Sequence, residues 1–161
     1  MANPIVEMKT THGVVKIELY ADKAPATVEN FLKYVNDKYY DGLIFHRIID
    51  GFMIQGGGFD LSMKQKKSTY APIKLEVSRD LKHADGAISM ARTMDPNSAT
   101  NQFFICDGPQ KSLDMQYAVF GQVIAGMEVV QKISGVKTKR VNCFDDVPAQ
   151  PVVIESIRVV Q

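Results

Sequence analysis

The 161-residue chain lacks tryptophan, has only two cysteines and carries almost no net charge. Its 19 basic and 18 acidic residues leave a formal charge of +1. We therefore expect no nucleic-acid partner, because proteins that bind nucleic acids usually present a wide basic excess. Cys106 and Cys143 stand far apart and form no CxxC pair. This spacing predicts free thiols rather than a zinc site or a disulfide framework.

Long apolar runs are also missing. No stretch approaches the roughly 20 residues that a membrane-spanning helix needs. The first residues do not resemble a basic-then-apolar secretory leader. We therefore expect a cytoplasmic protein with no membrane association. The length suits one domain with a full core, so residues 1–161 are predicted to form a single domain.

The sequence motifs of several enzyme classes are absent. There is no GxSxG nucleophile elbow, no HExxH zinc motif, no phosphate-binding loop and no dinucleotide-binding fingerprint. The three histidines, His12, His46 and His83, are scattered along the chain. A serine hydrolase, a zinc hydrolase and a nucleotide-dependent enzyme are therefore not indicated.

Apolar periodicity predicts two helices and about eight strands. The first helix begins near Pro25 and carries one apolar stripe, at Val28, Phe31, Leu32 and Val35. The second is short and carries Met127, Val130 and Ile133 before a stop at Gly135. Strands are expected at 5–10, 13–20, 87–92, 102–106, 117–124 and 152–160, with two more in 43–55 around the turn Asp50–Gly51.

The many short strands predict a mainly β, antiparallel fold, because there is no strand–helix–strand alternation. The pattern alone leaves a sandwich and a closed barrel open, with the helices covering the open ends. Residues 93–101 read as a loop, and residues 59–85 show little regular pattern. The basic clusters Lys64–Lys67 and Lys137–Arg140 are expected in solvated loops.

One arginine, Arg47, stands in an otherwise apolar run that ends in three glycines. Strand alternation places Met53 and Gln55 on one face, and Gln102 and Phe104 on another. If these faces converge, they form an apolar floor bordered by two amides and a guanidinium. Such a site could hold a small apolar ring but offers no nucleophile, acid or base near neutral pH. It suits a reaction that needs only shape and electrostatics.

The runs 45–57 and 102–105 resemble the two signatures of the cyclophilin peptidyl-prolyl cis–trans isomerases. Fragments 90–93, 96–100 and 146–148 resemble most closely the short bacterial cytoplasmic branch, the peptidyl-prolyl isomerase B type. The resemblance spans nearly the whole chain. It implies a closed eight-stranded antiparallel β-barrel capped by two α-helices.

The resemblance also implies the activity and the site. It predicts acceleration of rotation about X-Pro bonds during protein folding, with no covalent intermediate, no metal and no cofactor. The expected ligands are Pro-containing segments of unfolded or flexible proteins, bound by a monomer. The implied catalytic residues are Arg47 and Gln55. The implied substrate-binding residues are Phe52, Met53, Ala91, Arg92, Gln102, Phe104, Leu113 and Tyr117. Because Phe52 would point away from Met53 in a straight strand, a bend near Gly51 is required.

Three positions depart from the common pattern of the family. Tyr117 stands where a histidine is common, Arg92 where many relatives carry asparagine, and Ser112 where a tryptophan helps to bind cyclosporin. We therefore expect retained isomerase activity with weak cyclosporin affinity. The alternative is a module that binds proline segments without catalysis. Arg47 favours the enzyme, because a binding module would not need this guanidinium specifically.

Overall fold

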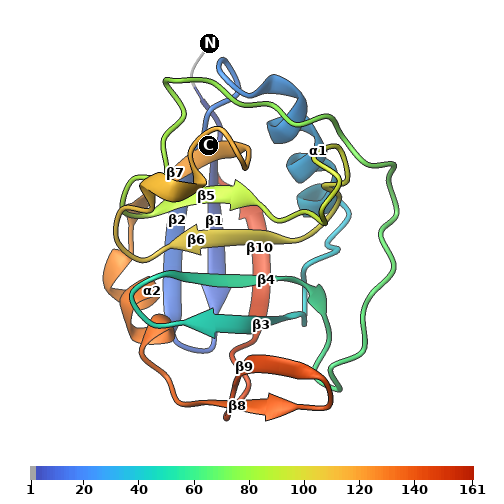
Figure 1. Ribbon diagram of the computed structural model, residues 1–161, viewed down its shortest axis with the longest axis vertical. Coiled ribbons are helices and arrows are strands. Elements are labelled where there is room, and N and C mark those ends of the chain that lie inside the picture. The colour runs from blue at the N-terminus through green and yellow to red at the C-terminus, as the bar shows by residue number, and fades with distance from the viewer. Residues whose placement is uncertain (1–2) are drawn as a thin grey trace.

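The computed structural model describes residues 3–161, whose main feature is an eight-stranded antiparallel sheet (Figure 1). Its strands are β1 (Ile5–Thr10), β2 (Gly13–Leu19), β3 (Ile44–Ile49), β4 (Met53–Phe59), β5 (Ala87–Met90), β6 (Phe103–Cys106), β7 (Val119–Ala125) and β10 (Ile154–Val159). They lie in the order β10-β1-β2-β7-β5-β6-β4-β3. Each matches a strand predicted from the sequence, and Figure 1 shows β3 to β6 crossing in front of β1, β2 and β10.

The sheet curls but does not close along its two edge strands. Within residues 3–161, one isolated bridge joins the two edges, between Ile44 of β3 and Val153, the residue before β10. Two backbone hydrogen bonds flank it, from Phe45 N to Val152 O at 3.1 Å and from Ile154 N to Leu43 O at 2.7 Å. The expected closed barrel is therefore wrong in this respect, and the fold is an open, curled half-barrel. The edges meet only where the chain leads into β3 and β10.

A second hairpin packs beside the open edge at β3. It consists of β8 (Thr138–Val141) and β9 (Phe144–Pro148), and β9 contacts β3. The Phe144 ring meets Phe59 of β4 edge-on, with 5.1 Å between ring centroids. The prediction of a loop at Lys137–Arg140 is therefore wrong, because most of this cluster forms β8. Its exposed lysine and arginine give a four-residue strand no apolar alternation to reveal it.

Two helices lie near opposite ends of the curled sheet (Figure 1). Helix α1 (Pro25–Asn36) buries Val28, Phe31 and Val35 as its stripe predicts, and Phe31 contacts Phe103 and Phe120 with centroid distances of 5.6 and 5.0 Å. Helix α2 (Met127–Ser134) buries Val130 and Ile133. Both helices therefore bury their predicted apolar stripes in one core with the sheet.

A long irregular segment, residues 60–86, runs along the outside of the molecule past α1 (Figure 1). It supplies the cap that α1 lacks locally, because Ala24 at the N-cap has no side-chain acceptor. Glu76 accepts hydrogen bonds from Thr27 N at 2.9 Å and from Thr27 Oγ1 at 2.7 Å. A carboxylate at this position satisfies free N–H groups and complements the helix dipole. The irregular segment is thus tied to the start of α1.

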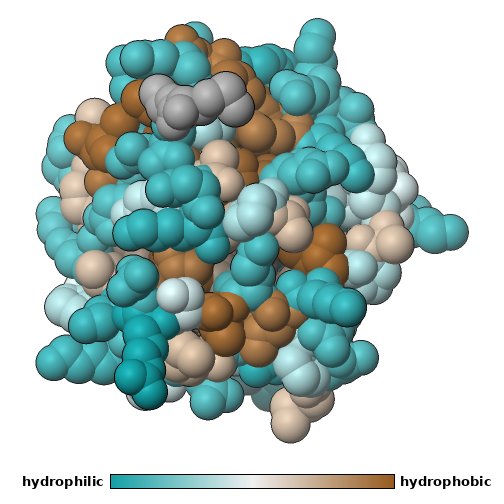
Figure 2. All heavy atoms as spheres, turned by 90° about the horizontal axis from the view of Figure 1, so that it is seen from above, coloured by the Kyte–Doolittle hydropathy of each residue, from teal (hydrophilic) through white to brown (hydrophobic). Residues whose placement is uncertain are grey.

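The surface seen from above is largely hydrophilic, with apolar patches set among polar side chains (Figure 2). Neither helix in residues 3–161 has the length and apolar character needed to cross a bilayer.

We expect Glu76→Ala to lower the free energy of unfolding by about 2 kcal/mol, because it leaves the start of α1 and the buried Thr27 hydroxyl without an acceptor. Glu76→Gln keeps one acceptor oxygen, so it should lower the free energy of unfolding by about half as much. Urea unfolding of both variants measures these changes. Glu155→Ala, which removes an exposed glutamate of β10, is the control and should unfold like wild type. Equal stability of Glu76→Ala and wild type would contradict the cap.

Candidate active site

A small cavity of about 120 Å³ opens on the outer face of β3, β4 and β6. Nine of the ten residues that the resemblance implies line it together, namely Arg47, Phe52, Met53, Gln55, Ala91, Arg92, Phe104, Leu113 and Tyr117. The tenth, Gln102, lines a larger neighbouring cavity. The strand faces that carry Arg47, Met53 with Gln55, and Phe104 therefore converge, as predicted.

The floor of the small cavity is apolar and almost closed to solvent. Met53 is 2% exposed and Phe104 is 5% exposed. Phe104 lies opposite Gln55 of β4 and opposite Ser89 of β5 in the strand register. Tyr117 meets Phe104 edge-on, with centroids 5.6 Å apart at 87°. The result is a shallow seat with aromatic and thioether walls, which suits a compact apolar ring.

Phe52 reaches the cavity from a turn rather than from a strand. The chain turns over Asp50–Phe52, where Gly51 has φ of +74°, a conformation that favours glycine. Phe52 N donates to Ile49 O at 3.0 Å, and Phe52 O accepts from Asp107 N at 2.9 Å. Strand alternation does not apply to a residue in a turn. The bend that the sequence requires near Gly51 is confirmed.

The polar edge of the cavity is a chain of three side chains. Arg47 in β3 pairs with Gln55 in β4, and Arg47 Nη1 donates to Gln55 Oε1 at 3.5 Å. Gln55 Nε2 then donates to Gln102 Oε1 at 3.1 Å. Gly58 leaves room for Gln102, because a Cβ at Gly58 would lie 2.5 Å from Gln102 Cγ. Gln55 therefore connects the exposed guanidinium to Gln102 along the edge of the apolar seat.

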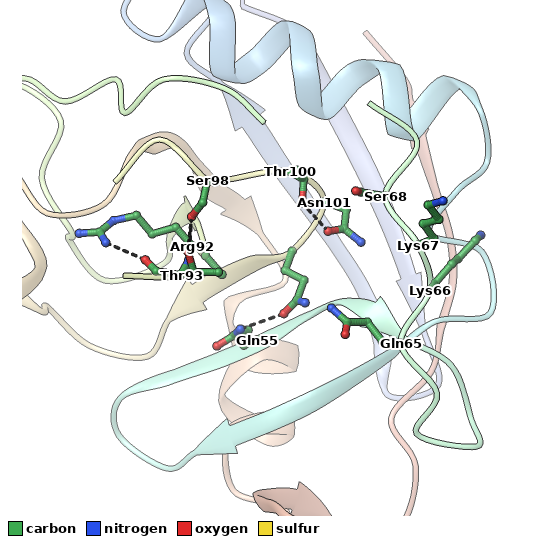
Figure 3. A pocket seen from close by; sticks show the side chains of 12 residues that line it. Gln55, Gln65, Lys66, Lys67, Ser68, Arg92, Thr93, Ser98, Thr100 and Asn101 are labelled. Atoms are coloured by element: carbon green, nitrogen blue, oxygen red, sulfur yellow. Dashed lines mark hydrogen bonds between the residues drawn. The ribbon is translucent and has the colours of Figure 1, made fainter. Parts of the chain in front are cut away.

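A larger cavity of about 580 Å³ adjoins the first and shares Gln55, Ala91 and Arg92 with it. Figure 3 shows its polar lining, which comes from the loop around Gln65 and Ser68 and from the loop 91–102. No pattern in the sequence predicts this cavity. Its walls belong to two irregular loops, so no periodicity could have revealed that they face each other.

Arg92 stands between the two cavities. Its guanidinium carbon lies 4.7 Å from the centre of the Tyr117 ring, and its Nε donates to Gln116 O at 2.9 Å. The stacking and the hydrogen bond restrict both side chains. Arg92 therefore holds Tyr117 in place at the lip of the small cavity.

His83 lies behind the floor and was not singled out from the sequence. Its buried ring stacks on Phe104, with centroids 5.9 Å apart at 8°. Burial lowers the pKa of His83, and the carboxylate of Asp114 partly opposes this effect. His83 sits in the irregular segment, where no sequence pattern indicates which residue it contacts.

His46 points to the opposite side of β3 from Arg47, in agreement with its interpretation as a structural residue. It is buried and packs on Phe59 with 4.3 Å between ring centroids. Its Nδ1 has no hydrogen-bond partner within residues 3–161. Burial, aided by the charge of Arg47, lowers the pKa of His46 to about 4. A neutral imidazole therefore backs the strand that carries Arg47.

Comparisons with known proteins find one matching family and related sequences over nearly the whole chain. The family described as cyclophilin type peptidyl-prolyl cis-trans isomerase/CLD matches residues 5–159. The peptidyl-prolyl cis-trans isomerase of Acinetobacter baylyi is 50% identical over 99% of this chain and 87% of its own. Peptidyl-prolyl cis-trans isomerase B of Escherichia coli K12 is 47% identical over 96% of this chain and 99% of its own.

The fold of this chain is similar to that of a solved structure. A cyclophilin type peptidyl-prolyl cis-trans isomerase of Cryptosporidium parvum, crystallised in the presence of the dipeptide Ala-Pro, matches with a TM-score of 0.84 at 28% sequence identity. The match covers 98% of this chain and 99% of that one.

We expect His46 to destabilise the fold in acid. An unfolded histidine has a pKa of about 6.5, so between pH 6.5 and pH 4 the unfolded chain binds a proton that folded His46 does not. The linked loss approaches about 3 kcal/mol at pH 4. His46→Leu should flatten this part of the curve of unfolding free energy against pH. Parallel curves for wild type and His46→Leu would contradict the prediction.

Proposed function

This chain belongs to the cyclophilin-type peptidyl-prolyl cis–trans isomerases, and we propose that its Arg47 guanidinium accelerates the rotation by stabilising the twisted X-Pro bond. The observation that carries the proposal is the position of Arg47. It is a donor that contacts Gln55 Oε1 at 3.5 Å, at the edge of an apolar cavity that also contains Phe104.

The physical reason lies in the peptide bond itself. Amide resonance sets the barrier to rotation at about 18–20 kcal/mol. In the twisted transition state the proline nitrogen becomes pyramidal and regains a lone pair, which the planar ground states lack. A guanidinium N–H that donates to this lone pair binds the transition state more tightly than either isomer, and this difference lowers the barrier. A thousandfold acceleration requires about 4 kcal/mol.

The apolar cavity holds the proline ring while the preceding residue rotates. Met53 and Phe104 form the floor, and Phe52, Leu113 and Tyr117 form the walls. Gln55 orients the guanidinium, and Gln102 supports Gln55 from the neighbouring cavity. Ala91 and Arg92 lie at the junction of the cavities, where an extended peptide would run beside the ring. The use of Ala-Pro with the C. parvum relative supports a ligand of this kind.

The reaction needs no covalent intermediate and no cofactor under this proposal. Rotation breaks no bond, so the enzyme needs differential binding rather than a nucleophile. We propose that the substrates are Pro-containing segments of unfolded or flexible proteins during folding, because a shallow seat for the ring leaves neighbouring residues free. A monomer in the cytoplasm suits this role.

A module that binds proline segments without catalysis is the second candidate. The larger adjoining cavity favours it, since the extra surface could hold a peptide for longer. The requirement for Arg47 distinguishes the enzyme from the binding module. Catalysis depends on its guanidinium, whereas retention of a peptide in the apolar seat does not.

Arg47→Ala should reduce kcat/KM for an X-Pro peptide at least tenfold, and the protein should stay folded because Arg47 is exposed. A coupled assay of cis–trans isomerisation measures it. Arg140→Ala, which removes an exposed arginine of β8, is the matched control and should match wild type. If folded wild type left the uncatalysed rate unchanged, the binding module would replace the enzyme.

Cyclosporin should inhibit this isomerase only weakly. Ser112 is exposed in the short helical turn η1 (Lys111–Leu113), where the family commonly has an indole that helps to bind the drug. We expect an inhibition constant above the nanomolar range in the same assay. The inhibition constant for Ser112→Trp should be at least tenfold lower. Nanomolar inhibition of wild type would mean that the turn around Ser112 is aligned incorrectly with the family.

A further inference from the structure

A buried histidine behind the cavity floor connects two aromatic residues of the site. His83 is 1% exposed, and its ring lies parallel to Phe104 at 5.9 Å. The same ring meets Tyr117 edge-on at 6.5 Å and 85°. Phe104 and Tyr117 contact each other and both line the small cavity. The orientation of His83 therefore affects the floor and one wall of the cavity without His83 lining it.

Asp114 fixes this histidine from the opposite side. Its Oδ1 accepts a hydrogen bond from His83 N at 2.7 Å and lies 2.9 Å from His83 Nδ1. Because an ionised carboxylate only accepts hydrogen bonds, Nδ1 carries the hydrogen. Nε2 then accepts from Ser89 Oγ, 3.0 Å away in β5. The imidazole is thus held in one tautomer and one orientation.

Asp114 is also the residue that follows Leu113, a wall of the cavity. Leu113 belongs to η1, which is three residues long and buries none of them fully. A turn this short gains little stability from its own hydrogen bonds and depends on outside contacts. Gln110 N donates to His83 O at 2.8 Å, so the segment around His83 holds η1 at both ends.

We propose that Asp114 is a positioning residue for the isomerase reaction. By holding the His83 ring against Phe104 and the end of η1 against His83, it sets the spacing between the cavity floor and Leu113. This inference rests on the proposed function of the cavity as the seat of the proline ring. Asp114 does not touch the substrate and acts through His83 and Leu113.

The proposal predicts a defined kinetic change. A looser seat binds the proline ring less well in both the ground state and the transition state, which raises KM more than it lowers kcat. We expect Asp114→Ala to lower kcat/KM for an X-Pro peptide about tenfold, mostly through KM. Asp114→Asn keeps an oxygen that accepts both hydrogen bonds from His83, so it should stay within threefold of wild type.

The experiment measures kcat and KM for wild type, Asp114→Ala, Asp114→Asn and exposed Asp22→Ala in the full chain. Thermal unfolding is recorded for each variant to show that it is folded at the assay temperature. His83→Phe keeps a ring against Phe104 but removes both ring nitrogens. It should raise KM like Asp114→Ala, and it replaces that variant if Asp114→Ala does not fold.

A rise in KM for Asp114→Ala, with rescue by Asp114→Asn and no change in Asp22→Ala, supports the proposal. Asp114→Ala, or His83→Phe in its place, with kcat/KM within twofold of wild type would overturn it and leave only a structural role. An equal loss in Asp114→Asn would also overturn it, because charge rather than hydrogen bonding would then be responsible. Inactive wild type would instead refute the proposed function, so the two failures are distinguishable.

Discussion

The register of four neighbouring antiparallel strands is the constraint on which the site depends. Arg47 of β3 lies opposite Gln55 of β4, Gln55 opposite Phe104 of β6, and Phe104 opposite Ser89 of β5. These four residues form one row across the outer face, while the next row, which includes Ile54, fills the core. A slip of one residue in any strand would exchange the two faces. The guanidinium, the amide and the aromatic floor therefore stay together because the core must stay buried.

The remainder of the site comes from segments that the sheet does not order by itself. The turn that carries Phe52 depends on Gly51 and on a hydrogen bond to the residue that follows β6. Leu113 depends on a short turn held against His83, and Tyr117 is held by Arg92. The sheet thus supplies a rigid floor and polar edge, and tied loops supply the walls. Such a division is common in binding sites, because loops carry side chains to positions that a strand cannot reach.

The irregular segment 60–86 has little secondary structure, but it makes several contacts that hold other parts of the protein in place. It caps α1 through Glu76 and places His83 behind Phe104. Its loop around Gln65 forms one wall of the larger cavity. The segment therefore contacts both the start of α1 and the back of the site, which are far apart in sequence.

Local pattern predicted much of this protein. Alternation of apolar residues indicated the eight strands of the sheet, and it placed Met53 with Gln55 and Gln102 with Phe104. Helical spacing indicated both helices, and the bend near Gly51 was required because the resemblance puts Phe52 in the site while strand alternation points it away from Met53. The resemblance carried by the runs 45–57 and 102–105 then indicated the family and ten site residues, of which nine line one cavity. The hairpin β8–β9 escaped detection, because its short strands carry charged side chains in place of an apolar face.

The sequence by itself determined which residues share a strand face and which chemistry they offer, because side-chain direction in a strand follows directly from position. Tertiary structure alone decided how the sheet edges meet, with one bridge between β3 and the residue before β10 instead of a closed ladder. It also decided that Asp114 meets His83 and that two irregular loops face each other across the larger cavity. These contacts depend on how the whole chain packs, and packing between distant segments leaves no periodic signal in the local sequence.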